Sequence, residues 1–331
     1  MKIPIRESRK ILPFCVLILL AGCATRRDAV TINAVSARFP TLDELAAREL
    51  GPDDALLIGA GDIAECGRQL PHAKDTAAII AKFPKATVFT AGDDAYTNGK
   101  ADEFKQCYDV AWGPFKERTR PSPGNHDYGI YLHPPRNDAR PYFDYFGANA
   151  GPRDLGYYSY DLGGWHIVSL NSMASQPGPP AMADQVAWLK SDLDRNQKPC
   201  ILAYWHHPLF SSGDAHGDDP GDPGRLTKPL WDVLLAHKAD VILNGHDHHY
   251  ERFAPQNSSA AATPDGIREI IAGTGGGEKR GLGTVKPNSQ KRLSGLYGVL
   301  LMTLHPSSYE WHFINANGTV EDASSGRIEC H

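Results

Sequence analysis

The chain contains several short, continuously apolar segments that alternate with segments of helical periodicity. The apolar segments span residues 55–60, 87–91, 201–205 and 241–243. A strand that is apolar on both faces must be covered on both faces, as happens in α/β proteins. Residues 76–83, 186–193 and 230–236 have the pattern of helices that bury one face. The alternation therefore predicts buried parallel strands with helices on the outside.

The last third of the chain has a different pattern. Residues 268–272, 297–304 and 309–314 have the pattern of antiparallel strands, and Asn317-Gly318 is a hairpin turn signal. Strands that alternate with helices in the first part of the chain, followed by antiparallel strands in the last third, predict an α/β sandwich of two sheets. The 331 residues are 41 % hydrophobic, which is ordinary for a globular protein and excludes disordered and fibrous classes. We find no internal repeat.

Each apolar segment, and a shorter one at residues 119–123, is followed directly by residues that can bind metal ions. These residues are Asp62, Asp93, Tyr96, Asn125, His206, His246 and His248. Functional side chains in α/β folds gather at the carboxyl ends of strands, so we expect these residues to lie together. His246 and His248 are two residues apart, and on an extended segment both face the same way. Carboxylate, amide and imidazole ligands in this number predict a hydrolytic site with two metal ions.

The order of these motifs resembles that of the calcineurin-like metallophosphoesterases, over residues 55–320. Within that superfamily the chain is similar to the purple acid phosphatase branch. Ala64 stands where most members have a metal-binding histidine, and Tyr96 stands three residues after Asp93, where the branch has a tyrosine. The resemblance implies a four-layer αββα sandwich of two mixed β-sheets. It also implies hydrolysis of phosphate esters.

The resemblance further implies which residues bind each ion. The first ion would be held by Asp62, Asp93, Tyr96 and His248, and the second by Asp93, Asn125, His206 and His246. The carboxylate and phenolate at the first position favour Fe(III). The neutral amide and imidazoles at the second position suit Zn(II), Fe(II) or Mn(II), and zinc at both positions is the alternative.

The implied reaction is in-line attack on phosphorus by a metal-bound hydroxide. His126 resembles the histidine that stabilises the transferring phosphoryl group, and His216 lies where the family has a histidine that contacts substrate or protonates the leaving group. We expect a phosphomonoesterase that acts on small phosphate esters. A phosphodiesterase or nucleotidase on the same fold is the alternative, and a non-catalytic metal- or phosphate-binding lipoprotein is a remote one.

The N-terminus has the pattern of a secretory signal. A positively charged start precedes a short apolar run and the sequence Leu20-Ala21-Gly22-Cys23, which resembles a bacterial lipoprotein signal. We therefore expect a signal peptide at residues 1–22, a lipidated Cys23, a tether with one short helix at residues 23–52 and a catalytic domain at residues 53–331. The expected location is extracytoplasmic and lipid-anchored to a bacterial membrane. A net charge of −5 provides no positive field for nucleic acid.

Four cysteines remain after the expected lipidation site. Outside the cytoplasm an even number permits two disulfides in one of three pairings, of which we favour Cys66 with Cys107 and Cys200 with Cys330. Several polar residues near the motifs are expected neither to bind metal nor to take part in catalysis. We expect His207 to point away from the metal face and the acidic loop at residues 214–222 to be a solvated lid. Lys279 and Arg280 are candidates for contact with substrate.

Overall fold

The computed structural model describes residues 38–133, 135, 138–175 and 181–331. Residues Phe39–His331 form one compact unit, which is built on two seven-stranded sheets and a two-stranded one. The first large sheet has the order β15-β14-β13-β1-β3-β5, with β16 beside β14. Its strands are β1 (Ala55–Ala60), β3 (Thr87–Ala91), β5 (Thr119–Ser122), β13 (Gly298–Leu304), β14 (Ser308–Asn315), β15 (Val320–Ala323) and β16 (Ile328–Glu329).

The second large sheet has the order β12-β10-β11-β9-β8-β7-β6. Its strands are β6 (Tyr158–Leu162), β7 (Trp165–Ser169), β8 (Cys200–Tyr204), β9 (Val241–Asn244), β10 (Tyr250–Phe253), β11 (Arg268–Ala272) and β12 (Ser289–Leu293). Both large sheets are mixed: β1, β3 and β5 are parallel, as are β7, β8, β9 and β11, whereas β13 and β6 pair antiparallel with their neighbours. The short strands β2 (Ala64–Glu65) and β4 (Ala95–Tyr96) form the two-stranded sheet.

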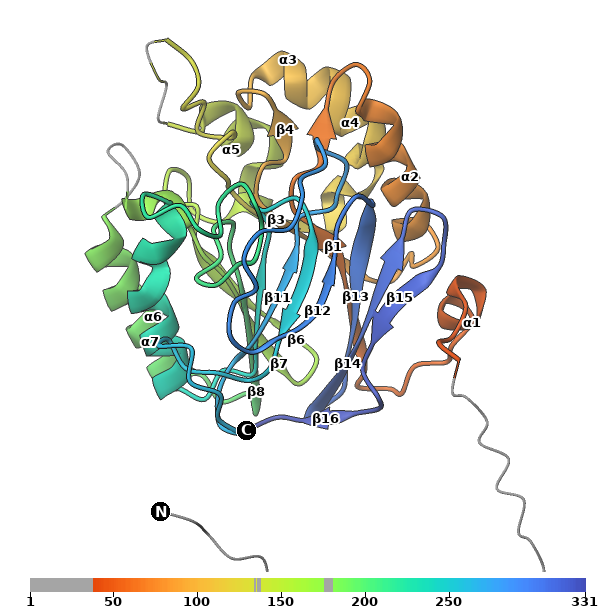
Figure 1. The fold of residues 1–331 in the computed structure, drawn as a ribbon, viewed down its shortest axis with the longest axis vertical. Coiled ribbons are helices and arrows are strands. Elements are labelled where there is room, and N and C mark those ends of the chain that lie inside the picture. Colours follow the sequence, from red (N-terminus) through yellow and green to blue (C-terminus); the bar gives the residue numbers. More distant parts are fainter. Residues whose placement is uncertain (1–37, 134, 136–137, 176–180) are drawn as a thin grey trace, which may run out of the picture. The chain divides into compact units, whose positions relative to one another are not determined.

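Helices cover the outer face of each large sheet (Figure 1). The first sheet carries α2 (Leu70–Ile80), the π-helix η1 (Phe104–Tyr108), α4 (Asp109–Ala111) and α5 (Arg140–Phe146). The short helix α3 (Ala101–Glu103) has no buried residue and leads into η1. The second sheet carries α6 (Met182–Arg195) and α7 (Lys228–Ala236). The remaining helical segments are α1 (Leu42–Ala46) and the 3-10 turns η2 (Gly113–Arg118), η3 (Gly147–Ala150), η4 (Ser172–Ser175) and η5 (Pro223–Thr227).

Successive side chains of each central strand point to opposite faces of the sheet, and the core therefore has three apolar layers. One lies between the two large sheets, and the other two lie between each sheet and its helices. Leu57 on β1 faces the space between the sheets, whereas its neighbour Ile58 faces the helices. Leu202 on β8 likewise faces the inter-sheet layer, and Ile201 faces α6 and α7. Successive strand residues point to opposite faces, so a continuously apolar strand serves two layers. The four-layer αββα sandwich of two mixed sheets is confirmed.

Three parts of the fold differ from the pattern expected from the sequence. Helix α2 begins at Leu70, six residues before the expected start. The hairpin of β6 and β7 and the helix α5 lie in regions that showed no clear periodicity. The short helix expected within residues 23–52 is present as α1, and its Leu45 is buried in the same apolar layer as α2.

The predicted signal peptide and Cys23 lie outside the described residues. Within the described part of the chain, none of the helices has the length and apolar character needed to cross a membrane.

Two disulfides join distant parts of the compact unit. One links Cys66, just after β2, to Cys107 of η1, and the other links Cys200 of β8 to Cys330 near the C-terminus. This is the pairing favoured from the sequence. The second bond closes a loop of 130 residues, and long closed loops limit the unfolded chain most.

An ion-pair cluster at His166 of β7 gives a pH-dependent contribution to stability. His166 of β7 places Nδ1 2.9 Å from an Asp161 oxygen and Nε2 2.8 Å from an Asp192 oxygen. Burial opposes the charged imidazole, but the two carboxylates outweigh it and raise the pKa of His166 above its usual 6.5. A raised folded-state pKa gives stability that is complete below pH 6.5 and is lost as the pH rises through the folded value.

The substitution His166→Gln is therefore expected to flatten the fall in the free energy of unfolding as the pH rises above 6.5. Urea unfolding at several pH values measures that slope in the parent chain and the variant. The partially exposed pair of His237 and Asp194 offers a control, because His237→Gln removes an ion pair in which Asp194 is half exposed. An unchanged slope in His166→Gln would contradict the assignment.

Candidate metal centre

The seven predicted metal ligands meet at one edge of the sandwich. Asp62 follows β1, Asp93 follows β3, and Asn125 comes three residues after β5. His206 follows β8 with one residue between, and both His246 and His248 follow β9. All seven side chains are buried, with at most 9 % of any residue exposed. The parallel strands end at the same edge of each sheet, which is why residues far apart in sequence converge there.

The phenol oxygen of Tyr96 lies at the centre of the first group of ligand atoms. It is 2.8 Å from Asp62 Oδ1, 3.2 Å from Asp93 Oδ2 and 3.1 Å from His248 Nε2. His248 Nε2 is in turn 3.2 Å from Asp62 Oδ1. The four residues predicted to hold the first ion thus place one atom each in a single small space.

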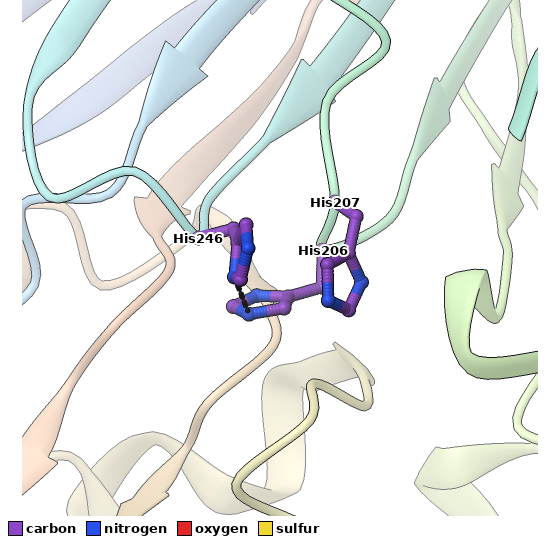
Figure 2. Close-up of side chains that lie close together, drawn as sticks. All are labelled: His206, His207 and His246. Carbon is purple, nitrogen blue, oxygen red and sulfur yellow. Dashed lines mark hydrogen bonds between the residues drawn. The ribbon is translucent and has the colours of Figure 1, made fainter. Parts of the chain in front are cut away.

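His206 Nε2 has the same place in the second group. It is 2.9 Å from Asn125 Oδ1, 3.1 Å from His246 Nδ1 and 3.2 Å from Asp93 Oδ2. Figure 2 shows the rings of His206 and His246 joined by this nitrogen contact. Asp93 Oδ2 belongs to both groups, and it is therefore the atom that two ions would share.

Every ligand histidine uses its second ring nitrogen to contact a protein oxygen. His206 Nδ1 is 2.8 Å from the carbonyl of Ala91, and His246 Nε2 is 2.9 Å from an Asp222 carboxylate oxygen. His248 Nδ1 contacts the carbonyl of Glu278. Such contacts fix the ring orientation and leave the other nitrogen available as a ligand, as is typical of metal-binding histidines.

The donor set fits two cations. Donor atoms 2.8–3.2 Å apart have the spacing expected of ligands that share one ion at about 2.0–2.2 Å. Three of the ligands, Asp62, Asp93 and His246, have positive φ angles of 61°, 53° and 69°. Non-glycine residues pay strain in that region and are held there mainly at functional sites. Burial would raise the pKa of Asp93, but the charges of His206 and His126 outweigh it and keep that pKa well below its usual range.

Two glycines make room for ligands that belong to other loops. A Cβ atom on Gly92 would lie 2.6 Å from His206 Nδ1, and one on Gly124 would lie 2.2 Å from Asp93 Oδ1. Gly92 also has a φ of 80°, which other residues rarely adopt. Glycine before the ligands is therefore a packing requirement of the assembled centre.

The two predicted catalytic histidines flank the ligand groups. His126 donates its backbone N–H to Asp93 Oδ1 at 2.8 Å, and its Nε2 is 3.7 Å from Asp93 Oδ2. His126 Nδ1 is 2.6 Å from the carbonyl of Thr97. The ring of His216 packs against that of His246 in a tilted arrangement, with centroids 3.9 Å apart, and the His216 side chain is 31 % exposed. Both histidines line a cavity of about 210 Å³ that also contains Asp93, Asn125, His246 and His248.

Asp222 is the main residue of the site that the sequence pattern did not indicate. It belongs to the acidic loop expected to be solvated, yet it is only 8 % exposed. One carboxylate oxygen lies 2.9 Å from His246 Nε2 and 3.3 Å from His216 Nδ1. Burial would raise the pKa of Asp222, but its bonds to His216 and His246 hold it well below its usual range. Asp222 therefore orients a metal ligand and a catalytic candidate together.

His207, Lys279 and Arg280 lie near the candidate metal centre, and their contacts differ. The ring of His207 lies 4.2 Å from that of His246 (Figure 2). Ser172 Oγ is 2.7 Å from His207 Nδ1. Arg280 lines the 210 Å³ cavity, whereas the Lys279 ammonium lies over the Tyr297 ring, 4.4 Å from its centre. Of the two candidates for contact with substrate, the structure therefore favours Arg280.

Asp127 ties two ligand loops together. Its carboxylate accepts the backbone N–H of Gly124 at 2.8 Å and that of Asp94 at 3.1 Å. These bonds join the loop that carries Asn125 to the loop that carries Asp93. From the sequence, Asp127 is expected to cap or orient its neighbours rather than bind a metal ion, and these hydrogen bonds agree with that role.

We expect Asp222→Asn to weaken zinc binding by about 10- to 100-fold, because an amide is a poorer partner for the imidazole of His246. Competition with a chelator of known zinc affinity measures the change directly, without reference to turnover. Asp218→Asn in the same loop is the matched control, since Asp218 is half exposed and pairs with Lys286. Equal zinc affinity in the two variants would contradict the role of Asp222.

Comparisons with known proteins agree with this geometry. The family model for calcineurin-like phosphoesterases matches residues 36–250. Purple acid phosphatase 15 of Arabidopsis thaliana is 27 % identical over 241 residues, which is 69 % of this chain and 41 % of that protein. Purple acid phosphatase 21 of the same plant is 35 % identical over 123 residues, which is 36 % of this chain and 26 % of that protein. The chain thus spans less than half the length of these two relatives.

Solved structures show the same fold. A purple acid phosphatase from yellow lupin seeds superimposes with a TM-score of 0.67 at 18 % identity, over 82 % of this chain and 53 % of that one. GAP50, described as the anchor in the inner membrane complex of Plasmodium, gives 0.62 at 16 % identity, over 84 % of this chain and 89 % of that one. These structures share a fold with the chain, and fold alone does not fix activity. Because the family model matches well over half of the residues, including most of the metal centre, the chain belongs to the calcineurin-like phosphoesterase family.

Proposed function

We propose that this protein is a phosphomonoesterase of the purple acid phosphatase type that uses two metal ions. The observation that carries the proposal is the position of the Tyr96 hydroxyl, which contacts Asp62, Asp93 and His248 at once. Ala64 cannot bind a metal through its side chain. The pairing of β2 with β4 places Ala95 opposite Ala64 and Tyr96 opposite the next residue, Glu65. The tyrosine thereby completes the first group of ligands.

The two groups of ligands differ in charge, which supports a trivalent ion in the first group and a divalent ion in the second. Burial and the carboxylates of Asp62 and Asp93 raise the pKa of Tyr96 well above its usual value, so a phenolate there requires a strong positive charge. We therefore assign Fe(III) to the first group. Asn125, His206 and His246 are neutral ligands that suit Zn(II), Fe(II) or Mn(II) in the second group. When bound, such ions polarise the phosphate and allow water to act as a nucleophile near neutral pH.

The chain's own residues provide proton transfer and orientation. Water oxygen forms a bond to phosphorus as the bond from phosphorus to the alcohol oxygen breaks, giving inorganic phosphate and an alcohol. His126, fixed by Asp93 and Thr97, is placed to donate a hydrogen bond to a phosphoryl oxygen. His216 protonates the departing alcohol oxygen, and because Asp222 holds Nδ1 we assign this role to Nε2. A positioned general acid contributes about 10²–10⁴-fold.

A direct test compares a chromogenic phosphate monoester with its bis-ester analogue, using the full chain loaded with iron and zinc. We expect a higher kcat/KM for the monoester. Preference for the bis-ester would instead favour a phosphodiesterase, and full metal content without turnover of either ester would favour a non-catalytic binding protein.

We further propose that the protein acts outside the cytoplasm, anchored by lipid on Cys23. The two disulfides support an oxidising compartment, and the sequence up to Cys23 supports lipidation. Metabolic labelling with palmitate should mark the parent chain and leave Cys23→Ser unmarked. Equal labelling of both would contradict the anchor.

A further inference from the structure

The space around the ligand groups continues into two cavities that share a wall. The cavity of about 210 Å³ and a second of about 330 Å³ are both lined by Asn125, Tyr131, His216 and His246. The two cavities therefore adjoin as one groove, and two candidate metal ligands, Asn125 and His246, lie in the wall that they share. A phosphate held at the centre can extend its ester group into either cavity.

The two cavities differ in chemistry. The smaller one, the charged arm, has Glu65, Glu278 and Arg280 in its wall. Arg280 is already 3.5 Å from a Glu278 oxygen, so its charge is partly compensated. The larger one, the apolar arm, has Ile130, Tyr131, Met173 and Pro223 in its wall. An ester group without charge is stabilised in the apolar arm by removal of its surface from water.

Tyr131 gives the apolar arm an aromatic surface that contacts His126. Its side chain is unusual because 51 % of this large residue is exposed, although most large aromatic side chains of the described chain are buried. The ring is held against His126, with centroids 4.6 Å apart and planes inclined by 34°. His126 in turn lies 4.4 Å from the ring of Tyr96. Three rings thus lead from the metal ligands to the solvent, and the outermost one offers a face for stacking.

The charges around the groove disfavour a second anionic group on the substrate. The apolar arm contains Asp219 and Asp222, and the charged arm contains Glu65 and Glu278. Among the described residues that line these two cavities, Arg280 is the one arginine or lysine. Further phosphates on an ester group would come close to the carboxylates of Asp219, Glu65 and Glu278, which repel them.

We propose that the preferred substrates are monoesters of neutral aromatic alcohols, whose ring stacks on Tyr131 in the apolar arm. Tyr131 is then a residue that determines specificity, and polyanionic esters are discriminated against by the carboxylates of the groove. The inference rests on the proposed phosphomonoesterase activity and names its substrate class.

Kinetics on the full chain loaded with iron and zinc test the proposal. The probes are 1-naphthyl phosphate, glycerol 2-phosphate and adenosine triphosphate. In the parent chain we expect kcat/KM for the naphthyl ester to exceed that for each of the other two by tenfold or more. In Tyr131→Ala the ratio of naphthyl to glycerol kcat/KM should fall about 3- to 10-fold, mainly through KM, because one ring contact is lost.

Two further variants separate the ring from other effects. Tyr131→Phe retains the ring and should keep the naphthyl-to-glycerol ratio within twofold of the parent value. Val110→Ala is the matched surface control, because Val110 is 49 % exposed and lies on α4, outside both cavity walls. An unchanged ratio in Tyr131→Ala, an equal loss in Tyr131→Phe, or faster turnover of adenosine triphosphate than of the naphthyl ester would overturn the proposal.

A binding measurement distinguishes failure of this inference from failure of the proposed function. Calorimetry with 1-naphthylmethylphosphonate and methylphosphonate reports the contribution of the ring without any turnover. Tighter binding of the naphthyl compound by the parent chain, lost in Tyr131→Ala, supports the apolar arm even if no monoester is hydrolysed. Equal binding of both compounds would overturn the apolar arm while leaving phosphatase activity intact.

Discussion

The Asp93→Asn variant is expected to hydrolyse phosphate monoesters at least about 10³-fold more slowly than the parent chain, the upper end of the effect of removing a single electrostatic stabiliser. Asp93 Oδ2 lies 3.2 Å from both the Tyr96 hydroxyl and His206 Nε2, so one atom serves both ligand groups. An amide keeps the shape of the side chain but cannot supply the negative charge that two cations would share. The loss should therefore include metal content as well as turnover.

Steady-state kinetics and elemental analysis of the purified variant measure both consequences. Asp94→Asn is the matched control, since Asp94 is the adjacent residue and is also fully buried. Burial and the nearby Asp127 raise the pKa of Asp94 well above its usual value, so an amide resembles its neutral form. We expect this control to keep its metal ions and most of its activity. Full metal content and turnover in Asp93→Asn would exclude Asp93 as the shared ligand.

The Tyr96→Phe variant is expected to lose the visible absorption band of the iron(III)-loaded protein completely. The band arises from charge transfer between a phenolate ligand and Fe(III), and Tyr96 is the tyrosine whose hydroxyl lies among the ligand atoms of the first group. Phenylalanine retains the ring that packs 4.4 Å from His126, so the local packing is largely preserved. The spectrum therefore reports coordination rather than folding.

Titration of each metal-free protein with Fe(III), followed by absorption, provides the measurement. Tyr131→Phe serves as the control because Tyr131 borders the same cavity but is half exposed. This control should keep the band. A colourless iron(III) form of the parent chain, or a band that persists in Tyr96→Phe, would remove the purple acid phosphatase assignment and leave a phosphoesterase of the general type.

The strands that form the middle of the sandwich were predictable because their sequences are apolar on both faces. The hairpin of β6 and β7 was not, since β6 reads Tyr-Ser-Tyr-Asp-Leu and is only partly buried at the edge of its sheet. The start of α2 was also missed. Leu70-Pro71 at its N-terminus is a favourable helix start, but the polar residues that follow hide the apolar periodicity until Thr76.

The same contrast holds at the metal centre. His206 and Asp93 were predictable because each comes within two residues of the end of a buried strand, where the fold fixes its position. Asp222 lies 16 residues beyond His206, in a loop that has four other acidic or proline positions. This loop has no periodic pattern that would indicate which of its carboxylates contacts His246. In a strand, successive side chains point to opposite faces, so His207 is expected to point away from the side that His206 faces, and it does contact Ser172. Strand β8 ends at Tyr204, however, so strict alternation no longer applies at His207. Its ring therefore also meets His246.

The tight spaces at Gly92 and Gly124 have a consequence for protein engineering. Each glycine makes room for a ligand on a different loop, His206 in one case and Asp93 in the other, so glycine and ligand form interlocked pairs. A transplant of this centre into another scaffold would fail if ligands were introduced one at a time onto ordinary loops. Library designs should vary each glycine and its distant ligand jointly, and the smallest portable unit is the set of loops rather than the set of ligands.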